Sequence, residues 1–203
     1  METKKISKRK MQSVQTREKL LHAGQDIFIE FGFQKTTISQ IIKKAETGYG
    51  TAYVYFKNKD DILIELMEDV MERFYEIANR TYEPISKEEA FALIESQSIL
   101  FLDMANKEKL MMQVIEEAIR FSDNVRSKWT DIREQFINRI GEDIAYAQKN
   151  QLARSDVDCT IVARAWFHAN EMYLWEIVTD HKTPPIKEIV HNIASIYTEG
   201  LYK

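Results

Sequence analysis

The chain has 203 residues, of which 44% are hydrophobic, and it contains only six glycines and three prolines. This composition favours an all-helical protein that is large enough to bury a substantial core. No segment has the roughly 18 uncharged apolar residues of a membrane span, and no apolar signal region follows the charged N-terminus. The single cysteine, Cys159, excludes an internal disulfide framework and fits a reducing compartment. We therefore expect a cytoplasmic protein that does not contact a membrane.

The net charge of −4 hides a strong asymmetry along the chain. Residues 1–59 contain 12 lysines and arginines against 5 acidic residues, a net charge of +7. Residues 60–203 contain 16 against 27, a net charge of −11. A basic end on an acidic body orients a molecule toward a polyanion. Basic tails are common, so the asymmetry indicates nucleic-acid binding only together with a matching motif.

The first 16 residues show no apolar periodicity and predict a flexible basic arm. The arm carries a cationic cluster made of Lys4, Lys5, Lys8, Arg9 and Lys10. Such a cluster is either a solvated tail or an arm that enters the minor groove of DNA, and the sequence favours neither.

A helix-turn-helix pattern follows in residues 17–60. Apolar residues at helical spacing predict a first helix that ends at Gly32. The segment Thr37-Ile38-Ser39-Gln40 is a capping box that begins a second helix. Residues 46–48 form the turn, and the third helix is expected to direct Ala52, Tyr53 and Phe56 inward.

Residues 61–203 predict a second domain of six longer helices. Their approximate ranges are 60–80, 86–105, 108–121, 125–150, 156–180 and 185–203. With the three short helices this gives about nine helices in an all-α fold.

The third helix has the composition of a DNA-reading surface. It reads Tyr-Gly-Thr-Ala-Tyr-Val-Tyr over residues 49–55, where ordinary packing would favour leucine, glutamate and lysine. The second helix of such a pair fits the major groove, while the first braces across the backbone. The candidate DNA-binding residues are Thr37, Gly48, Tyr49, Gly50, Thr51, Tyr53, Tyr55 and Lys59.

The candidates have different assigned roles, and Tyr55 is placed with Lys59 where the DNA backbone rises beside the helix. Thr37 and Lys59 lie at helix ends and are assigned to phosphates, and the glycines allow close approach. Tyr49 and Thr51 face outward and are assigned to base edges. For Tyr53, ordinary packing with its hydroxyl near a phosphate is an equal alternative.

This segment resembles the TetR family of bacterial repressors. The resemblance rests on the pattern Phe28-x-x-x-Gly32-Phe33-x-x-Thr36-Thr37, then Ile41, then Gly50-Thr51-x-Tyr53-x-Tyr55-Phe56-x-x-Lys59-x-x-Ile62. It covers about residues 15–65. The resemblance implies a homodimer that binds a double-stranded DNA operator and releases it when a small molecule occupies the C-terminal domain. Two departures are Glu46 in place of the usual turn glycine and Ala52 in place of a frequent leucine.

The C-terminal domain predicts an apolar interior, and the resemblance places an effector pocket in it. Methionine and aromatic walls suit a hydrophobic or planar ligand. The candidate pocket residues are Phe101, Met104, Met111, Met112, Trp129, Phe136, Met172 and Trp175. For any one of them, filling the core is the more common role.

The last two helices are the expected dimer surface. They are rich in β-branched and small residues that permit close packing across a two-fold axis. The residues of these stripes are Val162, Ala165, Ala169, Ile189, Ile193, Ala194 and Tyr197. An intramolecular core would produce the same pattern, so the inference depends on the need for two DNA-reading units.

Catalysis has little support in the sequence, and no cofactor or metal is expected. The four histidines are scattered, and the pair His168 and Glu171 at i,i+3 favours a polar pair over a metal site. The sequence therefore predicts a DNA-binding transcriptional regulator, a repressor released by a ligand. The alternative is an architectural or cell-cycle DNA-binding protein of the same fold without small-molecule control.

Overall fold

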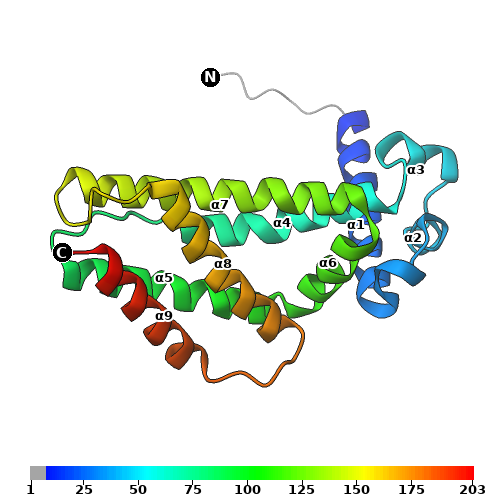
Figure 1. The fold of residues 1–203 in the computed structure, drawn as a ribbon. Helices are drawn as coiled ribbons and strands as arrows, with labels where there is room; N and C mark the ends of the chain where they lie inside the picture. The colour runs from blue at the N-terminus through cyan, green and yellow to red at the C-terminus, as the bar shows by residue number, and fades with distance from the viewer. Residues whose placement is uncertain (1–7) are drawn as a thin grey trace, which may run out of the picture. The chain divides into compact units, whose positions relative to one another are not determined.

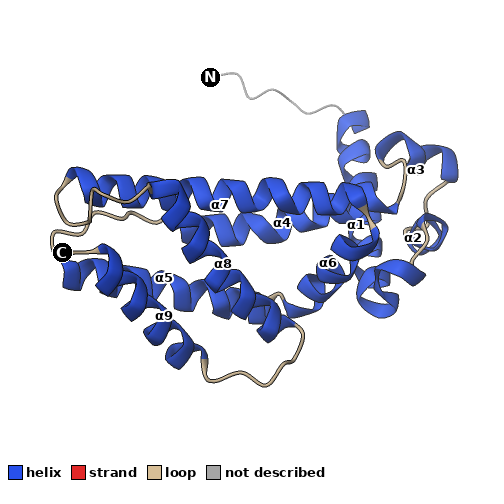
Figure 2. Cartoon of the chain, in the orientation of Figure 1, coloured by secondary structure: helices blue, strands red, loops and turns tan. Residues whose placement is uncertain are grey.

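The computed structural model describes residues 8–203, which form nine helices and no strand (Figures 1 and 2). The helices are α1 (Lys8–Lys35), α2 (Ile38–Lys44), α3 (Tyr49–Tyr55), α4 (Lys59–Ala78), α5 (Lys87–Lys107), α6 (Lys109–Phe121), α7 (Asp123–Lys149), α8 (Cys159–Val178) and α9 (Ile186–Leu201). The predicted all-α class and helix order are confirmed. None of the helices within residues 8–203 is long and apolar enough to cross a membrane.

The chain divides into two compact units. The first runs to Asp69 and also includes Val114–Ser127, and the second comprises Val70–Gln113 and Lys128–Lys203. The division differs from the boundary expected at residue 60, because the start of α4 and most of α6 pack in the first unit. An added Cβ on Gly24 of α1, for example, would lie 2.6 Å from the side chain of Ile62 on α4. Helices α4, α6 and α7 therefore each contribute residues to both units.

The expected flexible arm is wrong for residues 8–16, because α1 begins at Lys8. Residues 1–7, with Lys4 and Lys5, lie outside the described part of the chain. The sequence pattern missed this extension because a polar helical segment needs no apolar stripe when another contact holds it. Here Ser13 accepts a hydrogen bond of 2.9 Å from the hydroxyl of Tyr55 on α3. Gly32 interrupts α1 as expected, with φ 74 and ψ 175, but helical structure resumes as far as Lys35.

In the second unit, α5 packs against α8 and α9. Aromatic rings join α4, α5, α7 and α8 in a continuous cluster. The ring of Phe101 lies 5.1 Å from Phe74 and 5.9 Å from Phe136, and Phe136 stacks on Phe167 at 5.8 Å. This cluster forms one wall of the pocket that is described below.

Candidate DNA-binding surface and ligand pocket

The helix-turn-helix begins with the predicted capping box. Thr37 accepts from the backbone N–H of Gln40 at 3.3 Å, and the side chain of Gln40 accepts from the Thr37 N–H at 2.7 Å. Both interactions satisfy amide groups that the first turn of a helix leaves unpaired. Ile41 and Ile42 are buried on the inner face of α2. Thr37 itself is exposed, so its hydroxyl lies at the surface of the unit.

The turn between α2 and α3 has a left-handed residue at Glu46, with φ 51. The backbone N–H groups of Glu46 and Thr47 donate to carbonyl oxygens of α2. The Glu46 N–H donates to Lys43 O at 3.2 Å, and the Thr47 N–H donates to Ile42 O at 3.2 Å. The turn thus keeps its geometry without the glycine that the motif usually has. A non-glycine residue in this conformation costs about 1–2 kcal/mol.

Helix α3 buries one narrow side and exposes the rest. Ala52 and Phe56 are buried, as predicted, and pack the helix on the unit. The inward placement of Tyr53 is wrong, because its side chain is 48% exposed. Tyr49 is 54% exposed and Val54 is 78% exposed, and Thr51 is also exposed. Val54 was not predicted from the sequence. It follows Gly50 by four residues, so both lie on one helix face.

Neither glycine of α3 is required by the packing of the described residues. An added Cβ on Gly50 would have no atom within 4 Å, and one on Gly48 would meet only the Thr51 hydroxyl oxygen, at 3.9 Å. Gly48 has an ordinary extended conformation, with φ −68 and ψ 141. A glycine within a helix destabilises it by about 0.5–1 kcal/mol relative to alanine. The described residues therefore leave open space beside both glycines.

Exposed lysines lie on the chain segments before and after α3. They are Lys35, Lys43, Lys44 and Lys57. Lys44 is also 3.1 Å from Asp26, and at that exposure the pair contributes little to stability. The exposed residues of α3 are thus uncharged, and the neighbouring segments carry these lysines.

Besides Thr37, two of the predicted DNA-binding side chains have partners within the first unit. The hydroxyl of Tyr55 donates to Ser13, as described above. The ammonium of Lys59 donates to the carbonyl oxygens of Phe33 at 2.6 Å and Thr36 at 2.9 Å, and it lies 4.1 Å from the centre of the Phe33 ring. Burial lowers the pKa of Lys59, and the charges of Asp60 and Glu117 act in the opposite direction. Lys59 therefore stabilises the end of α1, and a phosphate would have to compete with these carbonyls for it.

Replacement of Lys59 by methionine tests this structural role. The variant keeps the apolar stem but leaves the carbonyls of Phe33 and Thr36 without their donor. We expect the free energy of unfolding to fall by about 1–3 kcal/mol in urea denaturation. Lys57→Met is the control, because Lys57 is exposed on the adjacent surface. Equal stability of the two variants would contradict the structural role.

Glu117 of α6 holds the opposite side of the same chain segment. Its carboxylate accepts from the backbone N–H of Phe33 at 2.7 Å and of Gln34 at 3.3 Å. An added Cβ on Gly32 would lie 2.7 Å from this carboxylate, so the contact also requires the glycine. The contact between Glu117 and Phe33 could not be predicted from a local sequence pattern, because the two residues are 84 positions apart in the chain.

The second unit contains a pocket between α4, α5, α7 and α8, with a cavity volume of about 80 Å³. Of the predicted pocket residues only Phe101 and Phe136 line it. The other six are not among its lining residues. Met111, Met112 and Trp129 are buried in the core, Met172 is 50% exposed, and Met104 and Trp175 are half-buried. Apolar spacing identifies residues that leave water, but it does not separate those that fill a core from those that line a cavity.

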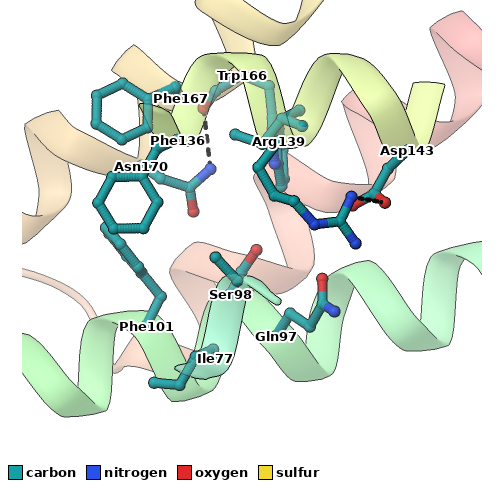
Figure 3. Close-up of a pocket in the computed structure, with 12 residues that line it drawn as sticks. Ile77, Gln97, Ser98, Phe101, Phe136, Arg139, Asp143, Trp166, Phe167 and Asn170 are labelled. Atoms are coloured by element: carbon teal, nitrogen blue, oxygen red, sulfur yellow. Dashed lines mark hydrogen bonds and ion pairs between the residues drawn. The ribbon is translucent and has the colours of Figure 1, made fainter. Parts of the chain in front are cut away.

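The pocket has an apolar side and a polar side. Figure 3 shows the rings of Phe101, Phe136 and Phe167 on one side and Gln97, Arg139 and Asp143 on the other. The guanidinium of Arg139 donates to the Asp143 carboxylate. Two further polar residues, Ser98 and Asn170, lie between these sides in the view of Figure 3. None of the polar lining residues was predicted from the sequence. The only sequence signal for them is that amide side chains occur on helix faces that are otherwise buried.

Burial raises the pKa of Asp143 to about 6, against the opposing effect of Arg139. The folded protein therefore binds this proton more tightly than the unfolded chain does. The resulting stability is present below about pH 4 and is lost as the pH rises through about 6. Relative to Asp143→Asn, we expect the free energy of unfolding of the wild type to fall by on the order of 2 kcal/mol between pH 4 and pH 7. A difference that stays constant with pH would contradict the raised pKa.

His168 and Glu171 form a polar pair. The Nδ1 atom of His168 lies 3.0 Å from Glu171, which also accepts from Trp129 Nε1 at 2.9 Å and from Arg133 Nε at 2.7 Å. Glu171 is buried, so these donors compensate its carboxylate. Within residues 8–203 no cluster of three metal-ligating side chains is present.

Helices α8 and α9, which carry the expected dimer stripes, have both buried and exposed apolar residues. Ile189 and Ala194 are buried within the chain, so they are wrongly assigned to a dimer surface. Ile161 and Ile196, by contrast, are 71% and 76% exposed, and Met172 adds a third exposed apolar side chain on these helices.

Residues 20–66, which contain the capping box, the turn and α3, match the model of a family described as bacterial regulatory proteins, tetR family. The N-terminal segment that contains the helix-turn-helix is thus similar to this family. The match lies within the first unit and includes the exposed face of α3 and Lys59. The family resemblance of the N-terminal segment is thereby confirmed.

Two curated proteins that are similar to part of the chain are named as regulators. The fatty acid metabolism regulator protein of Bacillus subtilis is 30% identical over 120 residues, which cover 59% of this chain and 61% of that protein. The HTH-type transcriptional regulator QacR of Staphylococcus aureus is 31% identical over 51 residues, which cover 25% and 27%. The alignments thus span less than two thirds of either relative.

Solved structures extend the similarity to nearly the whole fold. The SmeT–triclosan complex has a TM-score of 0.71 at 19% identity, covering 93% of this chain and 92% of that chain. A TetR transcription regulator from Haloarcula marismortui has a TM-score of 0.71 at 16% identity, covering 93% and 98%. At these identities the likeness establishes the fold.

Proposed function

We propose that this protein is a sequence-specific DNA-binding transcriptional regulator of the TetR family that acts in the cytoplasm. The observation that carries the proposal is the exposed face of α3. Gly48 before the helix and Gly50 within it leave open space there, and packing of the described residues does not require a glycine at either position. Tyr49, Thr51 and Val54 present hydroxyl and methyl groups beside that space, and such groups contact base edges and thymine methyls. The lysines of the neighbouring segments supply the sequence-independent attraction to phosphates.

The proposed DNA-bound form is a homodimer. A single three-helix reader contacts too little DNA for useful specificity, whereas two readers double the contacts. The exposed Ile161 and Ile196 on the last two helices support an interface there, because a second copy would bury both. A two-fold pair of readers would bind two half-sites on one face of the duplex.

The proposed control is release of the operator by a small molecule in the second unit. The pocket among α4, α5, α7 and α8 favours this regulator over the architectural alternative, which would have no need of a cavity. The relative SmeT has been solved with triclosan, so a protein of the same fold binds a small molecule. Helices α4 and α7 line the pocket, and both also supply residues to the first unit. A ligand that displaces either helix would alter the first unit.

Selection from a pool of random duplexes tests the DNA-binding proposal. The full chain should enrich one sequence with two-fold symmetry, and it should bind that sequence at least about 10³-fold tighter than an unselected duplex. Affinity for both DNAs should fall steeply with salt concentration, because lysines displace counterions from phosphates. A protein that binds all duplexes equally would contradict the proposal.

Gly50→Ala separates a DNA role of the glycine from a structural one. Because an added methyl group meets no atom of the described residues, the variant should be more stable by about 0.5–1 kcal/mol. Its operator affinity should nevertheless fall about tenfold or more, since the methyl group occupies space that the duplex needs. Thermal unfolding and fluorescence anisotropy with labelled operator give the two values. An operator affinity that is unchanged would remove Gly50 from the interface.

A further inference from the structure

The pocket of the second unit contains two buried polar atoms that no protein group satisfies. They are the side-chain nitrogen of Gln97, a donor, and the side-chain oxygen of Asn170, an acceptor. Neither atom has a hydrogen-bond partner among residues 8–203, and both residues line the pocket. Buried groups of this kind are normally paired, because leaving one unpaired is costly. Because these atoms line a pocket that also has aromatic walls, they indicate a ligand that forms the missing hydrogen bonds.

The orientation of Asn170 is fixed by the protein. Its Nδ2 donates to the Trp166 carbonyl oxygen at 3.0 Å, which leaves Oδ1 as the free end of the amide. In Figure 3 this oxygen points away from that bond, toward the side where Ser98 lies. Asn170 is only 6% exposed, and its side-chain oxygen is buried, so bulk water does not supply the missing hydrogen bond.

The charged residues of the pocket compensate each other. Arg139 donates to Asp143, and it also lies 3.6 Å from Glu142 and 3.5 Å from the Arg80 carbonyl. The pair therefore offers no uncompensated positive charge to an anion and no uncompensated carboxylate to a cation. An ionic ligand would lose its own hydration without gaining a counter-charge.

The remaining walls are flat and apolar. Phe136 lies edge-on to Phe101 at 5.9 Å and stacks with Phe167 at 5.8 Å, and Ile77 closes the apolar side. The polar side continues into an adjoining cavity that shares Gln97, Asp143 and Trp166 and reaches Tyr82 and Tyr202. A ligand would therefore place an apolar body against the rings and a polar group toward Gln97 and Asn170.

We infer that the effector is an uncharged amphipathic molecule whose hydroxyl or amide groups accept a hydrogen bond from Gln97 and donate one to Asn170. Hydroxyl and amide groups are the neutral groups that both donate and accept. The apolar body packs on Phe101, Phe136 and Phe167. This inference rests on the proposed ligand control and specifies the chemistry of its pocket.

A series of compounds with one body and different polar groups tests the inference on the full-length dimer. The probes are 4-propylphenol, 4-propylbenzamide, propylbenzene, 4-propylbenzoate and 4-propylbenzylamine, and binding is measured by titration calorimetry. The phenol and the benzamide should bind at least about tenfold tighter than propylbenzene, because each completes buried groups that the hydrocarbon leaves unpaired. Benzoate or benzylamine as the tightest binder, equal affinity for all five, or no binding would overturn the inference.

Two variants assign the selectivity to the named atoms. Gln97→Met and Asn170→Leu keep the side-chain volume and remove the unpaired atoms. Each should weaken 4-propylphenol about tenfold and leave propylbenzene unchanged. Neither should lower the melting temperature of the unliganded protein, as a merely structural role would require. Asn192→Leu is the matched control for Asn170, because exposed Asn192 makes the same bond to the carbonyl four residues earlier. Gln135→Met is the control for Gln97, since Gln135 is exposed and outside this pocket.

Operator affinity at saturating 4-propylphenol separates this inference from the proposed function. Binding that depends on the hydroxyl group but leaves the operator affinity unchanged would support the pocket chemistry and contradict ligand control. Release of the operator by propylbenzene as efficiently as by the phenol would support ligand control and overturn the inference.

Discussion

Joint replacement of Tyr49 and Thr51 by alanine is expected to abolish the discrimination between operator and random DNA. Each base contact contributes about 1–3 kcal/mol, so the loss of both should lower operator affinity by about 10²–10³-fold. Binding to random duplexes should change little, because phosphate contacts from lysines remain. Both side chains are exposed, so the free energy of unfolding should stay within about 0.5 kcal/mol of the wild type.

Fluorescence anisotropy on both DNAs at several salt concentrations provides this measurement. Thr160→Ala, which removes an exposed hydroxyl from α8 in the second unit, is the control and should behave as the wild type. If the double variant still prefers the operator, Tyr49 and Thr51 do not read the bases and the reading face must be sought elsewhere on the first unit.

Replacement of Ile196 by glutamate is expected to dissociate the proposed dimer. Ile196 is 76% exposed on α9, so the change should leave the monomer folded. In a two-fold interface the new carboxylate would be buried near its own copy, which costs about 3–5 kcal/mol when the charge is unpaired. Operator binding should then fall by at least about 100-fold, because each half-site is bound independently. Analytical ultracentrifugation and anisotropy give the two values.

Ile85→Glu is the control for this variant. Ile85 is 85% exposed and precedes α5, outside the last two helices, so its substitution should preserve both dimer and operator binding. A fully dimeric Ile196→Glu protein would show that another surface holds the copies together. Ile193, which the sequence places in the expected dimer stripe, is half-buried, so a charge there would also perturb the monomer.

The helix-turn-helix was predictable because its determinants are local. The capping box of Thr37 and Gln40 and the interruption at Gly32 depend on backbone groups within a few residues. The extension of α1 to Lys8 was not predictable, because the described contact that holds it joins Ser13 to Tyr55. Tyr53 was misplaced because α3 is only seven residues long, and its buried side is narrower than the spacing of aromatic residues implies.

The supporting and ligand-binding residues required the three-dimensional structure. Lys59 was assigned to phosphate from its place in the motif, but its ammonium group donates to carbonyls 23 and 26 residues earlier. Methionine and tryptophan were chosen for the pocket by type, but Met111, Met112 and Trp129 fill the core instead. The residues that give the pocket its polarity, Gln97 and Asn170, are distinguished only by missing partners. Such a property depends on the arrangement of four helices and has no local signature.

Hydroxyl-radical footprinting of the selected operator tests the central claim most directly. Two copies of α3 that read one face of the duplex should protect two symmetric half-sites, with centres about 34–36 Å apart, or one helical turn. The Tyr49→Ala, Thr51→Ala double variant should lose both protected regions together at the same protein concentration. A single protected region, or uniform weak protection along the duplex, would contradict a dimeric regulator that reads DNA through α3.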